Sequence, residues 1–342
     1  MGCCCKKYKN EIKNLSSLIH VSLSDFKQLK VLGKGKYGKV FLVEHIETKK
    51  LFAMKRLKKS DITNLKKIEH IKTERNLLEN LNHPFIVKLY YAFQDKDNLY
   101  FVTDFMQGGE FFSFLSKSVQ LKEKQARFYL SEILLALEYI HNKKCIYRDL
   151  KPENILIDKD GHLKLSDFGL SKILNENNYA YTICGTPEYE APEIYKNIGY
   201  DKMCDWWSFG IIMFEMIEGY IPFKGKINDN NLNIIFSDNR REVTKDLIMK
   251  LLVLDPKKRL GFNGIHEIKN HKFFDGVNFD NILNKKEKPP FIPAFKDKFD
   301  LRYFNSKYTQ MDIESFCDNS IMEIKDNDPN NSLFEGFSYY DN

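Results

Sequence analysis

The chain has 342 residues, with 53 Lys and Arg against 47 Asp and Glu, a net charge of +6 and 43% hydrophobic residues. This composition excludes a disordered, collagen-like or fibrous protein, and the length suits either two folding units or one large bilobal unit with extensions. The mild positive charge comes without a basic helix or an aromatic-basic alternation, so no nucleic acid is expected as a partner.

The cysteines and the apolar segments of the sequence indicate in which cellular compartment the protein is found. Three of the seven cysteines are adjacent, at Cys3 to Cys5, and the others are single, which is no framework of spaced pairs. A reducing, cytoplasmic compartment is therefore expected. No apolar run approaches the roughly 18–20 residues that cross a bilayer, and no apolar signal region follows the first residues, so neither a spanning nor a secreted protein is expected.

In chain order, residues 1–25 are rich in Lys, Asn and Ser and indicate an extension. From residue 26 the hydrophobic pattern has a period of two, then becomes helical, then has a period of two again. The predicted strands and the one predicted helix are, in order, 26–33, 39–47, 51–57, helix 61–80, 86–93 and 98–105. This pattern predicts a small antiparallel sheet with one inserted helix.

After Gly108 and Gly109 the spacing of apolar residues becomes helical, over 125–141, 210–220 and 243–254. These segments predict a larger, mainly helical lobe. Beyond residue 274 the chain has prolines and aromatic residues without period and acidic, Asn-rich stretches. Such a segment cannot form its own core, so it must pack on another part of the protein or remain loose.

A glycine-rich hairpin is predicted between the first two strands. Its residues are Gly33, Lys34, Gly35, Lys36, Tyr37, Gly38, Lys39 and Val40. Glycines there would let backbone N–H groups approach anionic oxygens without obstruction by a Cβ. A dinucleotide-binding loop would open a helix, whereas a strand follows here, so that interpretation is excluded. By itself the motif indicates little.

Two charged residues could cooperate with this hairpin. Lys55, on the strand 51–57, could pair with phosphates, although a solvated lysine is the commoner case. Glu74, on the predicted helix, could hold Lys55 by an ion pair, although a glutamate on a helix surface is equally ordinary. These alternatives stay open until the helical lobe is considered.

The helical lobe contains a polar motif from Tyr147 to Asn154, followed by Asp167, Phe168 and Gly169. Asp149 can orient an attacking hydroxyl and accept its proton, while Asn154 and Asp167 can supply oxygen ligands for Mg²⁺ carried on phosphates.

At this point the chain resembles the eukaryotic protein kinases, from Phe26 to about Phe274. The glycine-rich loop, the strand lysine, the helix glutamate, the two polar motifs, Ala191-Pro192-Glu193 and Asp205 occur in the order and spacing of that family. The segment 182–189, Tyr147 in place of histidine and the aromatic end 334–339 are similar to the AGC group, near protein kinase B and the cyclic-AMP-dependent kinase.

The resemblance implies an α+β, bilobal protein kinase fold. Its parts would be an extension at 1–25, a kinase domain at 26–274 and a tail at 275–342 that wraps on the small lobe. The small lobe, an antiparallel sheet with one main helix, would span 26–107, and the mainly helical large lobe would span 108–274.

The resemblance also implies ATP and Mg²⁺ as cofactors, bound in a cleft between the lobes. The residues expected around adenine are Leu32, Val40, Ala53, Leu156, the backbone near Asp104 and Met106, and Thr103 at the back. Lys55 would contact the α- and β-phosphates, Asn154 and Asp167 would hold Mg²⁺, and Lys151 would reach the transferring phosphoryl group.

The implied substrates are proteins phosphorylated on Ser or Thr in basic, arginine-containing sequences. Glu110, Glu153 and Glu215 match positions that similar kinases use for arginines preceding the target, although each could be an ordinary surface residue. Glu190 is a departure, because the family has an apolar residue there, and this affects the peptide-docking loop. The chain is also shorter than its relatives between Phe223 and Leu251.

Regulation is implied at two phosphorylation sites. Thr182 would be phosphorylated by an upstream kinase, and His70, Arg148 and Lys172 would bind the phosphate. Ser338 resembles a hydrophobic-motif site at which Phe334 and Phe337 dock on the small lobe. Further tail residues have implied places: Phe304 and Tyr308 near the nucleotide, and Thr309 and Ser315 as candidate turn-motif sites.

The first residues resemble an acylation signal, with myristoylation of Gly2, palmitoylation of one or more of Cys3, Cys4 and Cys5, and lysines that contact anionic lipid. Lys6 departs from the preferred Ser or Thr. The alternatives are an unmodified tail and a zinc cluster, which adjacent cysteines without a partner pair do not favour. The expected location is the cytosolic face of a membrane.

An active enzyme and a catalytically weak kinase-fold scaffold remain as function classes. A scaffold typically lacks at least one catalytic residue, whereas Lys55, Glu74, Asp149, Asn154 and Asp167 are all present. A small-molecule kinase of similar fold would have no need of the three glutamates expected to bind a basic peptide, Glu110, Glu153 and Glu215. The active protein kinase is therefore preferred.

Overall fold

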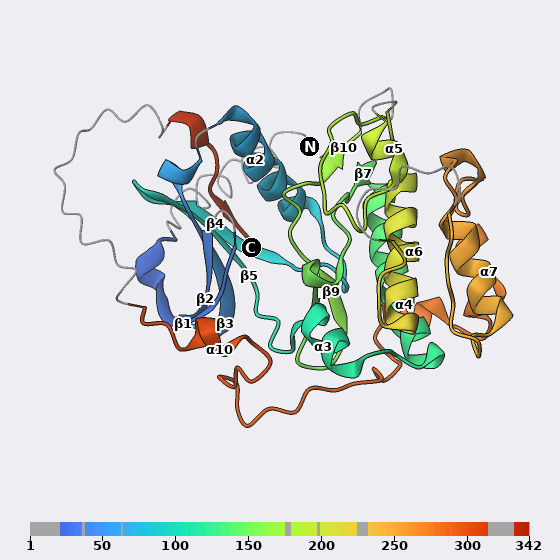
Figure 1. Ribbon diagram of the computed structural model, residues 1–342. Coiled ribbons are helices and arrows are strands. Elements are labelled where there is room, and N and C mark those ends of the chain that lie inside the picture. Colours follow the sequence, from blue (N-terminus) through green and yellow to red (C-terminus); the bar gives the residue numbers. More distant parts are fainter. Residues whose placement is uncertain are drawn as a thin grey trace, which may run out of the picture. The chain divides into compact units, whose positions relative to one another are not determined.

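The computed structural model describes residues 21–35, 38–62, 64–174, 179–196, 199–223, 232–313 and 332–341. The chain divides into two compact units (Figure 1). The sheet unit contains the described residues up to 62, residues 89–104 and the end of the chain, and the helical unit contains residues 64–88 and 105–309. This is the α+β architecture that the sequence predicts.

The sheet unit is a six-stranded sheet in which every neighbouring pair is antiparallel. Its order is β1-β2-β3-β5-β4-β11. The strands are β1 (Phe26–Lys34), β2 (Gly38–His45), β3 (Leu51–Lys58), β4 (Leu89–Gln94), β5 (Asn98–Asp104) and β11 (Tyr339–Tyr340). The five strands expected from the period of two are confirmed.

The β1–β2 hairpin depends on glycine. A Cβ at Gly38 would lie only 2.1 Å from the carbonyl oxygen of Arg56 on β3, so any larger residue would force β2 away from β3. Gly35 N–H donates to the carbonyl oxygen of Gly38 at 2.9 Å and closes the turn. Lys36 and Tyr37, at the tip of the expected phosphate-binding loop, lie outside the described residues.

The end of the chain packs on this sheet. Phe334 and Phe337 are buried, and Phe337 meets the ring of Phe101 edge to face at 5.3 Å between centroids. Gln94 Nε2 donates to the carbonyl oxygen of Phe334 at 2.9 Å. β11 adds an edge strand beside β4. The tail end therefore docks on the sheet, as the resemblance implies, through two aromatic anchors and backbone pairing.

The helical unit contains nine described α-helices and five short strands. The helices are α2 (Leu65–Asn80), α3 (Phe111–Ser118), α4 (Glu123–Asn142), α5 (Pro192–Tyr195), α6 (Met203–Glu218), α7 (Glu242–Leu251), α8 (His266–Lys269), α9 (Phe279–Leu283) and α10 (Ser306–Thr309). The strands are β6 (Gly109–Glu110), β7 (Cys145–Ile146), β8 (Ile155–Ile157), β9 (Leu163–Leu165) and β10 (Lys172–Ile173). The helical segments predicted after Gly109 are found as α4, α6 and α7.

Helix α6 is the centre of this unit and packs against α4 and α7 (Figure 1). Almost all its residues are buried, including Trp206 and Trp207, as expected for a helix that is apolar on every side. It ends at Gly219, whose φ of 82° places it in the left-handed region. A Cβ there would lie 2.2 Å from the carbonyl oxygen of Val119, so glycine is required by both backbone conformation and space.

Two predicted boundaries move for physical reasons. Helix α2 begins at Leu65 rather than at residue 61, because the Asn64 side chain accepts from Lys67 N–H at 2.9 Å and caps it. Strand β4 begins at Leu89 rather than at residue 86. Ile86 instead forms an isolated parallel bridge to Leu165, which a local pattern cannot reveal.

The segment after residue 274 packs over the helical unit up to Thr309. The Phe291 ring contacts that of Phe114 at 4.8 Å, and Lys285 pairs with Asp158 at 2.9 Å. Phe304 stacks on Phe105 at 5.8 Å. The expectation that this segment lacks its own core and packs elsewhere therefore holds for the described part. Within the described ranges, no helix is long and apolar enough to cross a membrane.

Candidate active site

A buried carboxylate shapes the loop that follows β7. Asp205, on α6, is fully buried and accepts from the backbone N–H groups of Tyr147 at 2.9 Å and Arg148 at 2.8 Å. His141 Nε2 lies 2.8 Å from the same carboxylate. Arg148 has a φ of 69°, a conformation that costs a non-glycine residue about 1–2 kcal/mol. Hydrogen bonds to a charged acceptor are strong enough to offset that strain.

Asp149 stands at the centre of a polar group. Asn154 Nδ2 donates to its Oδ2 at 2.7 Å, and Lys151 Nζ donates to its Oδ1 at 3.1 Å. The Thr186 hydroxyl bonds to both partners, accepting from Lys151 at 2.7 Å and donating to Asp149 at 3.1 Å. Asp149 and Asn154 are buried, while Lys151 is partly exposed. Three residues expected to be catalytic or metal-binding are thus brought together, and Thr186 joins them.

The second polar motif lies close by in the helical unit. Asp167 has a φ of 52°, and Phe168 is buried with its ring 5.1 Å from that of Tyr147. A Cβ at Gly169 would lie 3.3 Å from Asp167 Oδ1 and 3.5 Å from Glu74 Oε2. The carboxylates of Glu74, on α2, and Asp167 therefore both lie beside Gly169.

The donor set around Asn154 suits Mg²⁺ bound with phosphates. Because the amide nitrogen of Asn154 is bonded to Asp149, its oxygen is directed elsewhere. This oxygen and the Asp167 carboxylate are both hard donors, of the kind that Mg²⁺ takes from a protein when phosphates supply its other ligands. No group of three or more His, Cys, Asp or Glu residues able to hold a metal occurs in the described part, and this two-residue set does not need one.

The expected nucleotide residues of the sheet unit share one face. Val40 on β2 is paired with Lys55 on β3, and Ala53 is paired with Thr103 on β5. Because residues opposite each other or two apart along a strand point the same way, these four line one side of the sheet. The Thr103 hydroxyl donates to the Ala53 carbonyl at 3.4 Å.

The other expected nucleotide residues are divided between the units. Gly33 is paired with Val40, Leu32 is buried in β1, and Asp104 ends β5 and accepts from the Tyr90 hydroxyl at 3.1 Å. Met106 and Leu156 belong to the helical unit, Met106 buried and Leu156 on β8 opposite Glu110. The adenine contacts and the Lys55–Glu74 ion pair, which join residues of different units, stay predictions.

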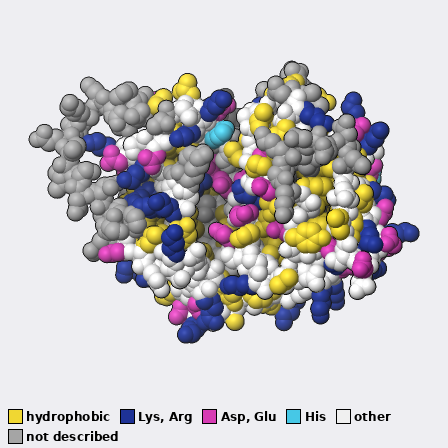
Figure 2. Space-filling model, viewed as in Figure 1, with side chains coloured by type: hydrophobic (Ala, Val, Ile, Leu, Met, Phe, Trp, Pro, Cys, Tyr) yellow, Lys and Arg dark blue, Asp and Glu magenta, His cyan; other side chains and the backbone are white. Residues whose placement is uncertain are grey.

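The expected substrate-binding residues are acidic, and Figure 2 shows several Asp and Glu side chains close to one another on the face in view. Among the expected substrate-binding residues, burial and the charge of Glu153 raise the pKa of Glu110. Burial and Glu153 also raise the pKa of Glu215, although it accepts from the Tyr189 hydroxyl at 2.7 Å. Glu153 therefore lies near enough to repel both Glu110 and Glu215, and a cation placed beside them would be stabilised.

The expected phosphate-binding residues all lie in the helical unit. Burial and the nearby charge of Arg148 lower the pKa of His70, so these two side chains are neighbours. Lys172 is on β10, paired with Ile146 just before Arg148. Arg148 Nη1 donates to the Tyr200 hydroxyl at 2.9 Å, and that hydroxyl donates to the carbonyl oxygen of Thr182.

Comparison with known proteins identifies the family of the chain. The sequence model of the protein kinase domain matches residues 26–274. The chain belongs to the protein kinase family. Protein kinase 3 of Dictyostelium discoideum is 43% identical over 302 residues, covering 83% of this chain and 33% of that protein. The cAMP-dependent protein kinase catalytic subunit of the same organism is 41% identical over 293 residues, covering 82% and 44%.

Human ribosomal protein S6 kinase alpha-3 is 43% identical over 298 residues, covering 84% of this chain and 40% of that protein. These relatives confirm the resemblance to the AGC kinases. The chain spans less than half the length of each of these three relatives.

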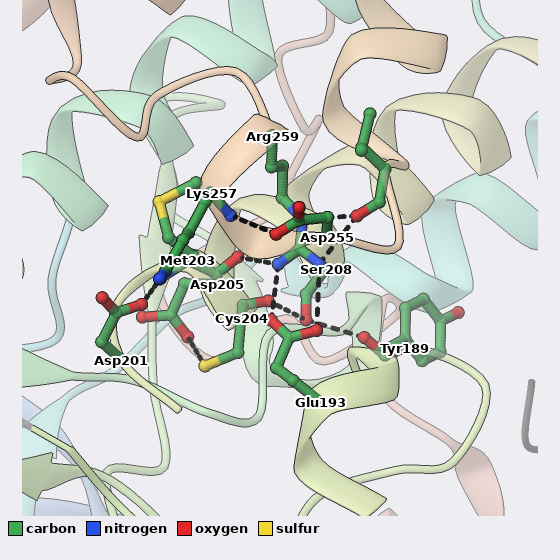
Figure 3. Close-up of polar contacts among 11 residues, drawn as sticks. Tyr189, Glu193, Asp201, Met203, Cys204, Asp205, Ser208, Asp255, Lys257 and Arg259 are labelled. Carbon is green, nitrogen blue, oxygen red and sulfur yellow. Dashed lines mark hydrogen bonds and ion pairs between the residues drawn. The ribbon is translucent and has the colours of Figure 1, made fainter. Parts of the chain in front are cut away.

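The kinase motif Ala191-Pro192-Glu193 is anchored by a residue that sequence reasoning did not single out. Glu193 forms a bidentate ion pair with Arg259, at 2.6 and 3.0 Å, and both side chains are buried (Figure 3). Arg259 also donates to the carbonyl oxygens of Met203 and Val253. No local pattern marks Arg259, because its partner lies 66 residues away.

We predict that Glu193→Gln destabilises the protein by about 3–5 kcal/mol, because it leaves the buried Arg259 guanidinium without its counter-charge. Urea unfolding followed by circular dichroism measures this. Lys250→Gln, which removes an exposed pair with Asp246, is the matched control and should cost less than about 1 kcal/mol. Equal, small losses for both variants would contradict the structural importance of the buried pair.

Proposed function

We propose that the chain is an ATP-dependent serine/threonine protein kinase that transfers the γ-phosphoryl group to basic protein substrates. The main support is the group of Asp149, Lys151, Asn154 and Thr186, which gathers a carboxylate, a cation, an amide and a hydroxyl within hydrogen-bond distance. Few other arrangements require these four functions together, and phosphoryl transfer uses each of them.

In this mechanism the protein mainly places groups and balances charge. Asp149 orients the substrate hydroxyl and takes its proton, and its position is set by Asn154. Lys151 is held beside Asp149 and stabilises charge on the phosphoryl group during transfer. Asn154 and Asp167 would hold Mg²⁺, which would neutralise phosphate charge when bound. Lys55, oriented by Glu74, pairs with the α- and β-phosphates.

Adenine would rest against apolar residues, in accord with the shared face of β2, β3 and β5. The residues proposed to bind the nucleotide are Leu32, Val40, Ala53, Thr103, Asp104, Met106, Leu156 and the loop 33–40. Their pairing on neighbouring strands supports this assignment within the sheet unit.

The proposed substrates carry arginine before the target Ser or Thr. The charge of Glu153 raises the pKa of both Glu110 and Glu215, so a guanidinium beside these carboxylates would relieve repulsion and supply counter-charge. Bidentate pairing with carboxylates favours arginine over lysine.

Phosphorylation of Thr182 by an upstream kinase is proposed as the activating switch. Arg148 is buried, and among the described residues no carboxylate forms an ion pair with it. A phosphate on Thr182 would supply that anion, with His70 and Lys172 as further partners. Ser338 is proposed as a second site, next to the docked Phe337 and the strand β11.

One phosphate-transfer assay tests the proposed activity and specificity. With radiolabelled ATP and Mg²⁺, the full chain should phosphorylate an arginine-rich Ser/Thr peptide in preference to an acidic one. Asp167→Ala should lower transfer by about 100-fold or more, because a metal ligand is lost. Asp160→Ala, in an exposed turn of the same lobe, is the control and should be unaffected. Preference for the acidic peptide, or full activity of Asp167→Ala, would refute the proposal.

The proposed location is the cytosolic face of a membrane, through myristoylated Gly2 and palmitoylated Cys3, Cys4 or Cys5. These residues lie outside the described part of the chain, so this proposal is supported by the sequence motif alone. A single acyl chain binds membranes only marginally, and a second acyl chain or nearby lysines make the attachment stable.

For this proposal, we expect the intact protein to sediment with membranes from eukaryotic cells and Gly2→Ala to remain in the supernatant, because the first acyl chain cannot be attached. Immunoblots of the two fractions provide the measurement. If both proteins distribute alike, acylation of Gly2 does not determine location.

A further inference from the structure

Tyr200 connects the segment around Thr182 to Arg148. Ala180 and Tyr200 form an antiparallel bridge with backbone hydrogen bonds of 2.7 and 2.9 Å in the two directions. The Tyr200 hydroxyl donates to the Thr182 carbonyl oxygen at 2.5 Å and accepts from Arg148 Nη1 at 2.9 Å. The Tyr200 hydroxyl therefore acts both as a hydrogen-bond donor and as an acceptor at this position.

The other end of this connection is rigid. Arg148 is held by its backbone N–H on Asp205 and by its side-chain Nε on the carbonyl oxygen of Leu170, both by short hydrogen bonds. Asp149 follows directly in the chain. A contact that moves or fixes Arg148 therefore also affects the position of Asp149, the proposed catalytic carboxylate.

The hydroxyl is suited to a permanent role. Burial raises the pKa of Tyr200, even though the charge of Arg148 acts to lower it. The phenol therefore remains protonated at neutral pH and keeps its donor hydrogen. Its ring is buried, so these contacts form away from competing water.

We infer that Tyr200 is a positioning residue that docks the Thr182 segment on Arg148 before Thr182 is phosphorylated. The contact to Thr182 is made by the backbone carbonyl, so it does not depend on the side chain or on its phosphate. Tyr200 and the phosphate are then two alternative ways to tie the same segment to the same guanidinium, the first weak and constant, the second strong and switchable.

This inference rests on the proposed switch at Thr182 and predicts a specific coupling. Loss of the Tyr200 hydroxyl should matter when the phosphate is absent and matter little when it is present, because a phosphate–guanidinium pair is much stronger than one neutral hydrogen bond. A residue with only a structural role would affect both forms equally.

The experiment compares Tyr200→Phe in two full-chain backgrounds, Thr182→Ala and a protein with phosphothreonine installed at position 182. Phosphate transfer to an arginine-rich peptide gives kcat. We expect Tyr200→Phe to lower kcat about fivefold or more in the Thr182→Ala background and less than about twofold in the phosphorylated protein. Thermal unfolding should shift by the same amount in both, since the same buried hydrogen bonds are lost.

Tyr220→Phe is the matched control, because the Tyr220 hydroxyl donates only to the exposed carbonyl of Ile235. It should leave kcat unchanged in both backgrounds. An equal loss for Tyr200→Phe in both backgrounds would overturn the inference, and so would a gain in the Thr182→Ala background, which would mean that Tyr200 competes for Arg148. If Thr182→Ala alone is as active as the phosphorylated protein, the proposed switch fails, and the inference fails with it.

Discussion

The helical unit depends on the buried carboxylate of Asp205. It is fully buried, yet it is compensated by two backbone N–H groups and by His141. An isolated buried charge would be very costly, so its presence implies that these donors are fixed. What they fix is the left-handed turn at Arg148, from which Asp149 is presented to Asn154, Lys151 and Thr186.

Helix α6 carries both anchors of this region. Asp205 holds the loop before Asp149, and the carbonyl of Met203 accepts from Arg259, which in turn holds Glu193. The loop that carries Asp149 and the segment that carries Thr186 are therefore both attached to the same buried helix, α6. This explains why α6 has large apolar residues on every side: a helix that fixes two loops must not itself shift. The same arrangement places Tyr200 just before α6, where it can tie Thr182 to Arg148.

Much of the fold could be predicted because its signals are local. The alternation in β2 and β3 and the three- and four-residue spacing in α4 require only near neighbours along the chain. The residues of the proposed site could be recognised from the order and spacing of their motifs. Contacts that join distant segments could not be read in this way. The alternating pattern predicted that strand β4 starts at residue 86, but Ile86 forms a bridge to Leu165 instead. Strand β11 joins the sheet by pairing with β4, which lies over 240 residues away in the chain.

The same limit applies to single residues. Arg259 and Tyr200 carry no local signal of their importance, because each acts through a partner that folding alone brings near. Helix α6 also begins at Met203, seven residues before the apolar run that predicted it, because its first turns include Asp205 and Ser208, polar residues that are buried through specific partners.

The most direct test of this account is the phosphate-transfer rate of Asp205→Asn. The amide removes the charge and places a donor against backbone N–H groups, so the turn at Arg148 should be disturbed while the shape of the core is kept. The account predicts a fall in kcat of about 100-fold or more, with circular dichroism unchanged and the affinity for MgATP within about threefold of that of the unaltered protein. A folded Asp205→Asn protein with undiminished kcat would contradict it.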